Sequence, residues 1–253
     1  MRHNTAMQII AIDSGNTRIK WGFWDGTAWA RIGALTHDEA AELPRALAAL
    51  PPPQCIAVSN VAGLGAAQGI EKACGHFGMP ITWAKSRPAQ CGLTNRYDPA
   101  QLGADRWAAL IGAWHRRQGA CLVVNAGTAT TADLLSTRGE FRGGIILPGL
   151  ALMKRSLAEN TARLPLAEGA YAEEPRNTAD AIDTGVLHAQ AGAIERMYAQ
   201  LASTESEAPA CLISGGAAAR IAERLGIAHR VVDHLVLDGL ACMVQESLKG
   251  GRS

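Results

Sequence analysis

The fold is decided by the stretch Ile9–Trp24, whose sequence is IIAIDSGNTRIKWGFW. The apolar run Ile9–Ile12 predicts a short strand, and Asp13 stands at its exit. Apolar residues alternate with others over residues 19–24, which predicts a second strand. Between the strands, Gly15 has no Cβ, can take a positive φ and lets backbone N–H groups approach a ligand closely. The pattern predicts a turn suited to phosphate and its metal ion, or else an ordinary hairpin with a polar turn.

Composition limits the class of protein. The chain has 253 residues, of which 48% are hydrophobic, enough for one large core or two packed ones. Its formal net charge of +1 gives no support for binding to nucleic acid or to a membrane surface. No apolar run approaches the ~18 residues of a membrane span, and the start of the chain lacks the apolar stretch of a signal peptide. We therefore expect a cytoplasmic protein.

The six cysteines lie far apart, and none forms a C-x-x-C pair. In a chain without a secretion signal this pattern predicts reduced thiols rather than disulfides. The seven histidines also lack the spacing of metal ligands. A structural zinc site or a Cys/His nucleophile pair is therefore not expected.

The second half of the chain repeats the first. After Gly119, Cys121–Val124 predicts a strand, residues 125–129 (NAGTA) a turn and Thr130–Leu135 another strand. Repetition at about half the chain length predicts two similar subdomains, residues 1–118 and 119–253. Strands and helices mix in both halves, so the predicted class is α/β. Two phosphate-type turns, one in each half, would close on one nucleotide from opposite sides.

Local patterns predict the remaining elements. Thr27–Ile32 is expected to form a third strand, and His37–Leu50 a helix opened by a capping box of Thr36 and Glu39. Residues 63–69 (GLGAAQG) miss a dinucleotide fingerprint by one residue and are interpreted as a strand-to-helix turn. The other expected elements are strands at Cys55–Val58, Ile81–Ala84, Phe141–Ile146 and Cys211–Ile213, helices at Gln101–Trp114, Leu150–Glu159, 177–202 and Leu235–Leu248, and loops at 85–99 and 160–176.

The pair of turns is the first candidate site. Asp13 is expected to help hold a hydrated Mg²⁺, since this metal keeps waters and uses few carboxylates. The amides of residues 15–17 and 127–129 would hold the β- and γ-phosphates. The sequence contains no G-x-x-x-x-G-K-[ST] motif, which excludes the usual P-loop route to the same task.

Residues 97–107 (YDPAQLGADRW) form the second candidate site, near the start of an amphipathic helix. Asp105 can accept a hydroxyl proton there, and Arg106 can bind an anion bidentately. The alternative is that a helix N-terminus simply favours an acid near its positive end. Two further segments are candidates: Asn177–Asp180, an N-cap box at an anion-binding helix terminus, and Ser214–Gly216, with room for a flat ring or a ribose.

Six segments, in chain order, resemble type III pantothenate kinase: DSGNT, YDPAQLGADRW, NAGTATTAD, GGIILPG, NT and SGG. The similarity runs from Ile9 to about Glu246, and GADRW and GTATT are its most specific parts. This family belongs to the superfamily of actin, sugar kinases and chaperone ATPases. The resemblance implies two actin- or ribonuclease-H-like subdomains with the nucleotide cleft between them, the second with the adenosine region and a dimer helix.

The resemblance also implies an activity: ATP-dependent phosphorylation of the primary hydroxyl of pantothenate to 4'-phosphopantothenate, the first step of coenzyme A biosynthesis. It makes Asp105 the catalytic proton acceptor. It implies that ATP is bound by Asp13, Ser14, Gly15, Asn16, Thr17, Arg18, Ile19, Lys20 and Thr128. It implies that pantothenate is surrounded by Tyr97, Gly103, Ala104, Asp105, Arg106 and Thr178. The implied cofactors are Mg²⁺, held by Asp13 through water, and K⁺ or NH₄⁺. Family members are typically cytoplasmic homodimers with the substrate site near the partner subunit.

One position departs from the family pattern. The second phosphate motif usually opens with Asp, whose carboxylate helps hold the monovalent cation, but here the residue is Asn125. An amide oxygen can still ligate a cation, yet it contributes no negative charge. We expect either weaker cation binding at Asn125 or replacement of the cation by another group.

Two other functions remain open for this sequence. One is an accessory transcription activator of the Baf type, which shares the fold and would need a nucleic-acid or regulator-binding surface. The other is a sugar kinase or phosphatase of the same superfamily, which explains the two turns but not all of residues 97–107. The net charge of +1 and the retained Asp13, Asp105 and Arg106 favour catalysis over DNA contact.

Overall fold

The computed structural model describes residues 7–162, 164, 166 and 168–250. The chain forms two compact units. The first runs up to Arg117 and takes up the chain again from Leu235, and the second is Gln118–His234. The change of unit at Arg117 lies close to the expected boundary at Gly119. The final segment differs from the expectation, because it returns to the first unit instead of completing the second.

A five-stranded sheet forms the centre of the first unit. Its order is β3 (Trp29–Thr36), β2 (Arg18–Trp24), β1 (Ile9–Ser14), β4 (Cys55–Asn60) and β5 (Ile81–Trp83). β1 is antiparallel to β2 and parallel to β4. β3 begins later than expected, because the Asp25 carboxylate accepts the N–H groups of Thr27 and Ala28 and holds them in a turn.

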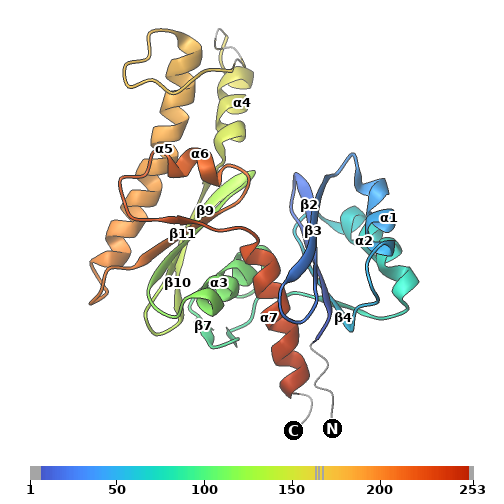
Figure 1. The fold of residues 1–253 in the computed structure, drawn as a ribbon. Coiled ribbons are helices and arrows are strands. Elements are labelled where there is room, and N and C mark those ends of the chain that lie inside the picture. Colours follow the sequence, from blue (N-terminus) through green and yellow to red (C-terminus); the bar gives the residue numbers. More distant parts are fainter. Residues whose placement is uncertain (1–6, 163, 165, 167, 251–253) are drawn as a thin grey trace. The chain divides into compact units, whose positions relative to one another are not determined.

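Helices cover both faces of this sheet. Ile10 and Ile12 point into a buried cluster with α1 (Leu43–Ala48) and α2 (Leu64–Cys74), while α3 (Ala104–Arg116) and α7 (Leu235–Gly250) contact the sheet from elsewhere in the unit. Figure 1 shows α1 and α2 on one side of the sheet and α7 on the other. The smaller elements of the unit are η1 (Ala40–Glu42), η2 (Gly75–Phe77), β6 (Ala89–Gln90) and β7 (Leu93–Asn95).

The helix expected at His37–Leu50 is shorter than predicted. Glu39 does accept hydrogen bonds from the Thr36 N–H (2.9 Å) and hydroxyl (3.0 Å), but Thr36 ends β3 and starts no helix. The α-helix begins only at Leu43, where Pro44 falls in the first turn. Proline lacks an N–H and is tolerated in a helix chiefly there, so its position fixes the start of α1. The turn at residues 63–69 does lead into a helix as expected, since Gly63 caps α2 with a φ of 92°.

Close packing explains why α7 belongs to the first unit. A Cβ on Gly112 of α3 would collide with the Leu235 carbonyl oxygen, and one on Gly239 of α7 would collide with Ala108 of α3. The two helices therefore approach each other backbone to backbone. Asp238 of α7 also accepts hydrogen bonds from the Trp29 indole (2.7 Å) and the Arg116 guanidinium (2.6 Å).

The second unit is built on a sheet with the same strand order. The unit supplies five consecutive strands of a seven-stranded sheet, in the order β10 (Glu140–Pro148), β9 (Ala129–Leu135), β8 (Cys121–Ala126), β11 (Ala210–Ser214) and β12 (Arg230–Val231), the last of which was not expected. The helices are α4 (Leu150–Asn160), α5 (Thr178–Ala202) and α6 (Ala218–Ala222). Figure 1 shows α4 and one half of α5 running alongside each other at one end of this sheet.

The internal repeat is confirmed in the register of the strands. In the first unit, Asp13 is paired with Lys20 on the antiparallel neighbour and with Ser59 on the parallel one. In the second unit, Asn125 is paired in the same way with Thr131 and Ser214.

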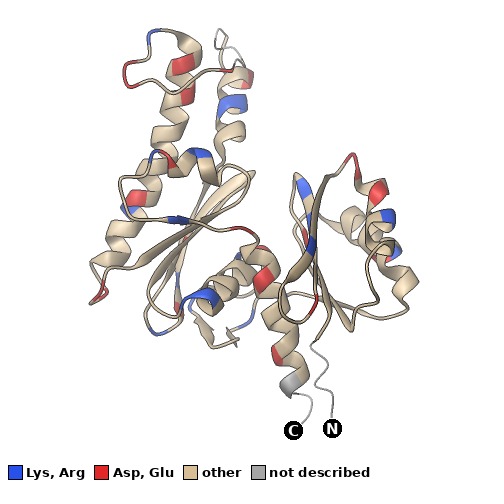
Figure 2. Ribbon diagram, in the orientation of Figure 1, with Lys and Arg blue, Asp and Glu red and all other residues tan. Residues whose placement is uncertain are grey.

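Two properties of the surface bear on partners. Along the ribbon of the described residues, Lys and Arg positions alternate with Asp and Glu positions in both units (Figure 2). None of the helices in the same residues combines the length and apolar character needed to cross a bilayer.

Candidate active site

Asp13 lies at the end of β1 in an unusual electrostatic environment. Burial, and after it the Asp105 carboxylate, raise the pKa of Asp13 to about 7, while the Lys20 ammonium lowers it. The structure therefore brings Asp13, Lys20 and Asp105 close together, although Asp105 is 92 positions further along the chain. The Oδ1 atom of Asp13 is buried and has no hydrogen-bond partner within the described part of the chain. A buried, unpaired carboxylate oxygen is an available ligand for a cation or for its bound water.

The turn after Asp13 is exposed and lies next to a histidine. The Gly15 N–H donates to the Arg18 carbonyl oxygen at 3.1 Å, and a ring nitrogen of His37 lies 2.7 Å from the Gly15 carbonyl oxygen. Asn16 and Thr17 are exposed, as is Arg18. Gly15 does not use the positive φ that glycine allows, so its role in this turn is not conformational.

Two of the residues expected to bind ATP turn their side chains into the core. Ser14 is fully buried, and Ile19 is 2% exposed. They face each other across the antiparallel ladder between β1 and β2. Only their main-chain groups are therefore candidates for a nucleotide contact.

Asp105 is held at the first turn of α3. Its Oδ1 accepts a hydrogen bond from the Arg106 N–H at 2.8 Å. The same oxygen lies against Gly103, the N-cap residue, where a Cβ would collide with it. Gly103 thus leaves the space that the carboxylate occupies, and Ala104 opens the helix beside it. Asp105 therefore lies at a helix N-terminus, where an acid is favourable, and it also lies close to Asp13.

Arg106 and Tyr97 lie together beside Asp105. The Arg106 guanidinium carbon is 5.5 Å from the centre of the Tyr97 ring, and the residue is only 5% exposed. The next residue, Trp107, is fully buried and donates its indole N–H to the Gln90 side chain at 3.0 Å. Trp107 therefore anchors the start of α3 and fixes the direction of the charged residues before it.

The second turn, residues 127–129, is exposed and closely supported from behind. The Gly127 N–H donates to the Ala129 carbonyl oxygen at 3.0 Å, as in the first turn. A Cβ on Gly149 would collide with the Gly127 carbonyl, and one on Gly215 with the Ala126 carbonyl. Gly215 also has a φ of 108°, which side chains rarely adopt. Both glycines are required where two further segments approach the turn that carries Thr128.

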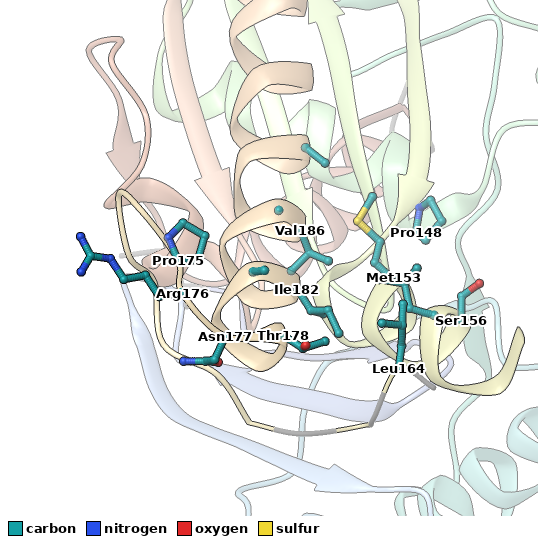
Figure 3. Close-up of a pocket in the computed structure, with 14 residues that line it drawn as sticks. Pro148, Met153, Ser156, Leu164, Pro175, Arg176, Asn177, Thr178, Ile182 and Val186 are labelled. Atoms are coloured by element: carbon teal, nitrogen blue, oxygen red, sulfur yellow. The ribbon is translucent and has the colours of Figure 1, made fainter. Parts of the chain in front are cut away.

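Thr178 lies elsewhere in the second unit, at the first position of α5. Asn177 caps this helix, since its Oδ1 accepts the Asp180 N–H at 2.9 Å, and the N-cap interpretation is confirmed. Thr178 lines a cavity of about 860 Å³ between α4 and α5, into which Met153 and Ile182 also point (Figure 3). The structure does not bring Thr178 into the same compact unit as Tyr97 and residues 103–106.

Sequence reasoning missed this cavity and a buried charge cluster beside it. The cavity is lined by Pro148, by Leu164 from the expected polar loop, and by Val186, and the apolar members of that loop were its available signal. The fully buried Asp183 of α5 pairs with Lys154 of α4 and Arg220 of α6. No sequence spacing indicated that these three residues would meet, because they come from three different helices.

Comparison with known proteins decides the family. The family model for type III pantothenate kinase matches residues 9–200. The chain belongs to the type III pantothenate kinase family. A type III pantothenate kinase from Aromatoleum aromaticum is 54% identical over 239 residues, which cover 94% of this chain and 98% of the relative.

Solved structures show how widely the fold of this pantothenate kinase family member is shared. A protein from Campylobacter jejuni described as a Baf family transcriptional activator has a TM-score of 0.60 at 22% identity, covering 95% of this chain and 99% of that one. A protein from Sinorhizobium meliloti described as a 2-dehydro-3-deoxygalactonokinase has a TM-score of 0.59 at 16% identity, covering 94% and 98%. These identities show the fold alone, which is the two-subdomain α/β fold of sugar kinases, as predicted.

Proposed function

We propose that the protein transfers the γ-phosphoryl group of ATP to the primary hydroxyl of pantothenate, giving 4'-phosphopantothenate for coenzyme A biosynthesis. The observation that carries the proposal is the meeting of Asp13, Lys20 and Asp105 at the first phosphate-type turn. Membership of the type III pantothenate kinase family supplies the substrate class. The family match does not favour the Baf-type alternative, whose structural likeness extends to the fold only.

Asp105 is the proposed proton acceptor. Its carboxylate is fixed on the Gly103–Arg106 backbone, so it is oriented before the substrate arrives. The hydroxyl oxygen of pantothenate attacks the γ-phosphorus of ATP while the Asp105 carboxylate takes the hydroxyl proton. The bond between the γ-phosphorus and the leaving ADP oxygen breaks. Phosphoryl transfer requires little covalent chemistry from the protein, since positioning and charge neutralisation dominate it.

Asp13 is the proposed ligand for Mg²⁺, through a bound water. The buried Oδ1 atom, which has no hydrogen-bond partner among the described residues, fits this role. Mg²⁺ in kinases is held by one or two carboxylates together with the substrate phosphates. When bound, the ion neutralises charge on the β- and γ-phosphates. The amides of Asn16 and Thr17 and the side chains of Arg18 and Lys20 are the groups proposed to face those phosphates, since the Gly15 N–H is already donated to the Arg18 carbonyl oxygen.

The second turn is the proposed partner of the first on the nucleotide. Its residues are exposed, and its backbone together with Thr128 is proposed to face phosphate oxygens. Asn125 occupies the position equivalent to Asp13 and is the proposed ligand for K⁺ or NH₄⁺. The Thr131 hydroxyl opposite Asn125 is buried without a hydrogen-bond partner in the described chain. A neutral amide and a hydroxyl would hold a monovalent cation less tightly than a carboxylate does.

Pantothenate is proposed to lie against Tyr97, residues 103–106 and Thr178. The buried, permanently charged Arg106 suits the substrate's carboxylate or the transferring phosphoryl group. We further propose a cytoplasmic homodimer. Support for the dimer comes from apolar side chains exposed on and near α4, namely Ile146 (61%), Leu152 (40%) and Leu166 (66%).

A coupled assay of ADP release tests the function directly. Purified protein is given ATP and Mg²⁺, with and without pantothenate, while K⁺ and NH₄⁺ are varied against Na⁺. We expect release that depends on pantothenate and is stimulated by K⁺ or NH₄⁺. Pantothenate-independent release, or none under any cation, would overturn the proposal.

A further inference from the structure

The buried amide of Gln190 has no role in the chemistry described so far. Gln190 lies in the middle of α5 and is fully buried. Its Nε2 donates to the Pro148 carbonyl oxygen at 2.6 Å and lies 3.5 Å from the Met153 sulfur. Its Oε1 is buried without a hydrogen-bond partner among the described residues. Packing alone would favour an apolar residue here, because burying a half-satisfied amide is costly. The contact with Pro148 therefore calls for an explanation.

That contact leads to the second phosphate-type turn. Pro148 is the last residue of β10 and is paired with Ala129 of β9. The next N–H, that of Gly149, donates to the Thr128 carbonyl oxygen at 2.9 Å. Gly149 also lies so close to the Gly127 carbonyl that no Cβ fits between them. Residues 148–149 thus support the turn through its Gly127 and Thr128 carbonyls.

We propose that Gln190 is a positioning residue for ATP. By holding the Pro148 carbonyl, it keeps Gly149 against Thr128 and so fixes the exposed turn at residues 127–129 in the position that the phosphates require. Gln190 itself does not touch the nucleotide and acts only through residues 148–149. The inference rests on the proposed binding of ATP at this turn.

The variant Gln190→Met tests the proposal, because methionine keeps the unbranched shape but cannot donate a hydrogen bond. We expect the KM for ATP to rise about 3- to 10-fold, the effect of losing one buried hydrogen bond. The kcat and the KM for pantothenate should stay within about 2-fold of the wild type, since the lost interaction concerns binding of the nucleotide. Calorimetric titration with ADP should give a matching rise in Kd. A purely structural role would lower the active fraction, and hence kcat, and leave KM and Kd unchanged.

Tyr198→Phe is the matched control. Tyr198 lies on the same helix and donates to another proline carbonyl, that of Pro209, at 3.0 Å. Pro209 precedes β11 and does not lie in the turn. This variant should lose a comparable hydrogen bond and leave the KM for ATP and the Kd for ADP unchanged.

The outcomes separate this inference from the proposed function. Unchanged KM and Kd in Gln190→Met, or equal changes in Tyr198→Phe, would overturn it. If Gln190→Met does not fold, Gln190→Leu is measured in the same way, and failure of both variants to fold also overturns it in favour of a folding role. A wild type that binds ADP without phosphorylating pantothenate would refute the proposed function, while the ADP titrations still decide the role of Gln190. A wild type that binds no ADP would refute both.

Discussion

The two strand–turn–strand motifs share a backbone and differ in chemistry. Each is an antiparallel pair, β1–β2 or β8–β9, with a third strand, β4 or β11, parallel to its first member. In each, a backbone N–H beyond the third strand donates to the last carbonyl of the first strand: Val61 to Ser14 at 3.0 Å and Ala217 to Ala126 at 3.1 Å. The same main-chain hydrogen bonds therefore recur in both motifs.

The side chains at equivalent positions of the two motifs differ in charge. The first motif carries charge, with Asp13 opposite Lys20 and close to Asp105. The second carries Asn125 opposite Thr131 at the equivalent positions, and two glycines pack closely behind its turn. The comparison indicates that the first motif contributes charged side chains, while the second contributes a closely packed backbone turn.

The largest expected effect comes from removing the base beside the first motif. Asp105→Asn should lower kcat by about 10²-fold or more, as for loss of a general base, with the folded structure retained. Steady-state kinetics and circular dichroism measure the two quantities. Asp25→Asn serves as the control, because Asp25 is an exposed acid in a turn of the same unit and should leave kcat within about 2-fold of the wild type. A normal rate in Asp105→Asn would remove Asp105 from the mechanism.

The second expected effect is a difference between the two turns in the stability lost when a glycine is replaced by alanine. Gly215→Ala should lower the free energy of unfolding by about 2–4 kcal/mol, since the residue has a positive φ and its Cβ would collide with Ala126. Gly15→Ala should cost less than about 1 kcal/mol, because a Cβ there meets only the Arg18 carbonyl oxygen at 3.6 Å. Urea denaturation of both variants measures the difference. Equal destabilisation would show that the two turns are supported alike.

The third effect is a dependence of stability on pH that only the first motif should show. Folding raises the pKa of Asp13 from its ordinary value of 3.8 to about 7, so the folded state binds the proton more tightly than the unfolded state. The stability that protonation contributes is complete below pH 4 and is lost as the pH rises through 7. Without Mg²⁺, the wild type should therefore lose stability relative to Asp13→Asn between pH 4 and pH 7.

Urea midpoints of both proteins across this range measure the difference. Asn125 does not titrate, so Asn125→Ala should run parallel to the wild type over the same range. A constant difference between the wild type and Asp13→Asn would show that the Asp13 carboxyl is not perturbed by folding.

The smallest expected effect comes from making the second motif more like the first. Asn125→Asp adds a carboxylate and should lower the K⁺ concentration for half-maximal activity about 3- to 10-fold, equivalent to about 1 kcal/mol of added attraction. Titration of the rate with K⁺ at constant ionic strength measures it, with Asn125→Ala as the uncharged counterpart. An unchanged K⁺ requirement would place the cation away from residue 125.

Much of this arrangement could be predicted from local sequence. The strands around Asp13 and Asn125, their turns and the repeat followed from short apolar runs that end in polar residues. The cap at Asn177, and with it the start of α5, followed from the N-cap box. These features depend on neighbours in the chain, which is why sequence patterns carry them.

The features that escaped prediction depend on distant contacts. The return of α7 to the first unit rests on the fit of Gly112 and Gly239 against the facing helix. A glycine in a helical sequence does not indicate which other helix packs against it. The raised pKa of Asp13 depends first on its burial and then on the approach of Asp105, and the hydrogen bond from Gln190 to Pro148 joins residues 42 positions apart. The start of α1 is a local feature, because Pro44 is tolerated chiefly in the first turn of a helix.

The most direct test of the account is the product itself. Purified wild-type protein and Asp105→Asn are incubated with ATP, Mg²⁺, K⁺ and pantothenate, and phosphopantothenate is measured by mass spectrometry. The account predicts pantothenate that gains one phosphoryl group in the wild type, with about 10²-fold less in Asp105→Asn at equal protein. No phosphorylated pantothenate from the folded wild type, or equal amounts from both proteins, would contradict it.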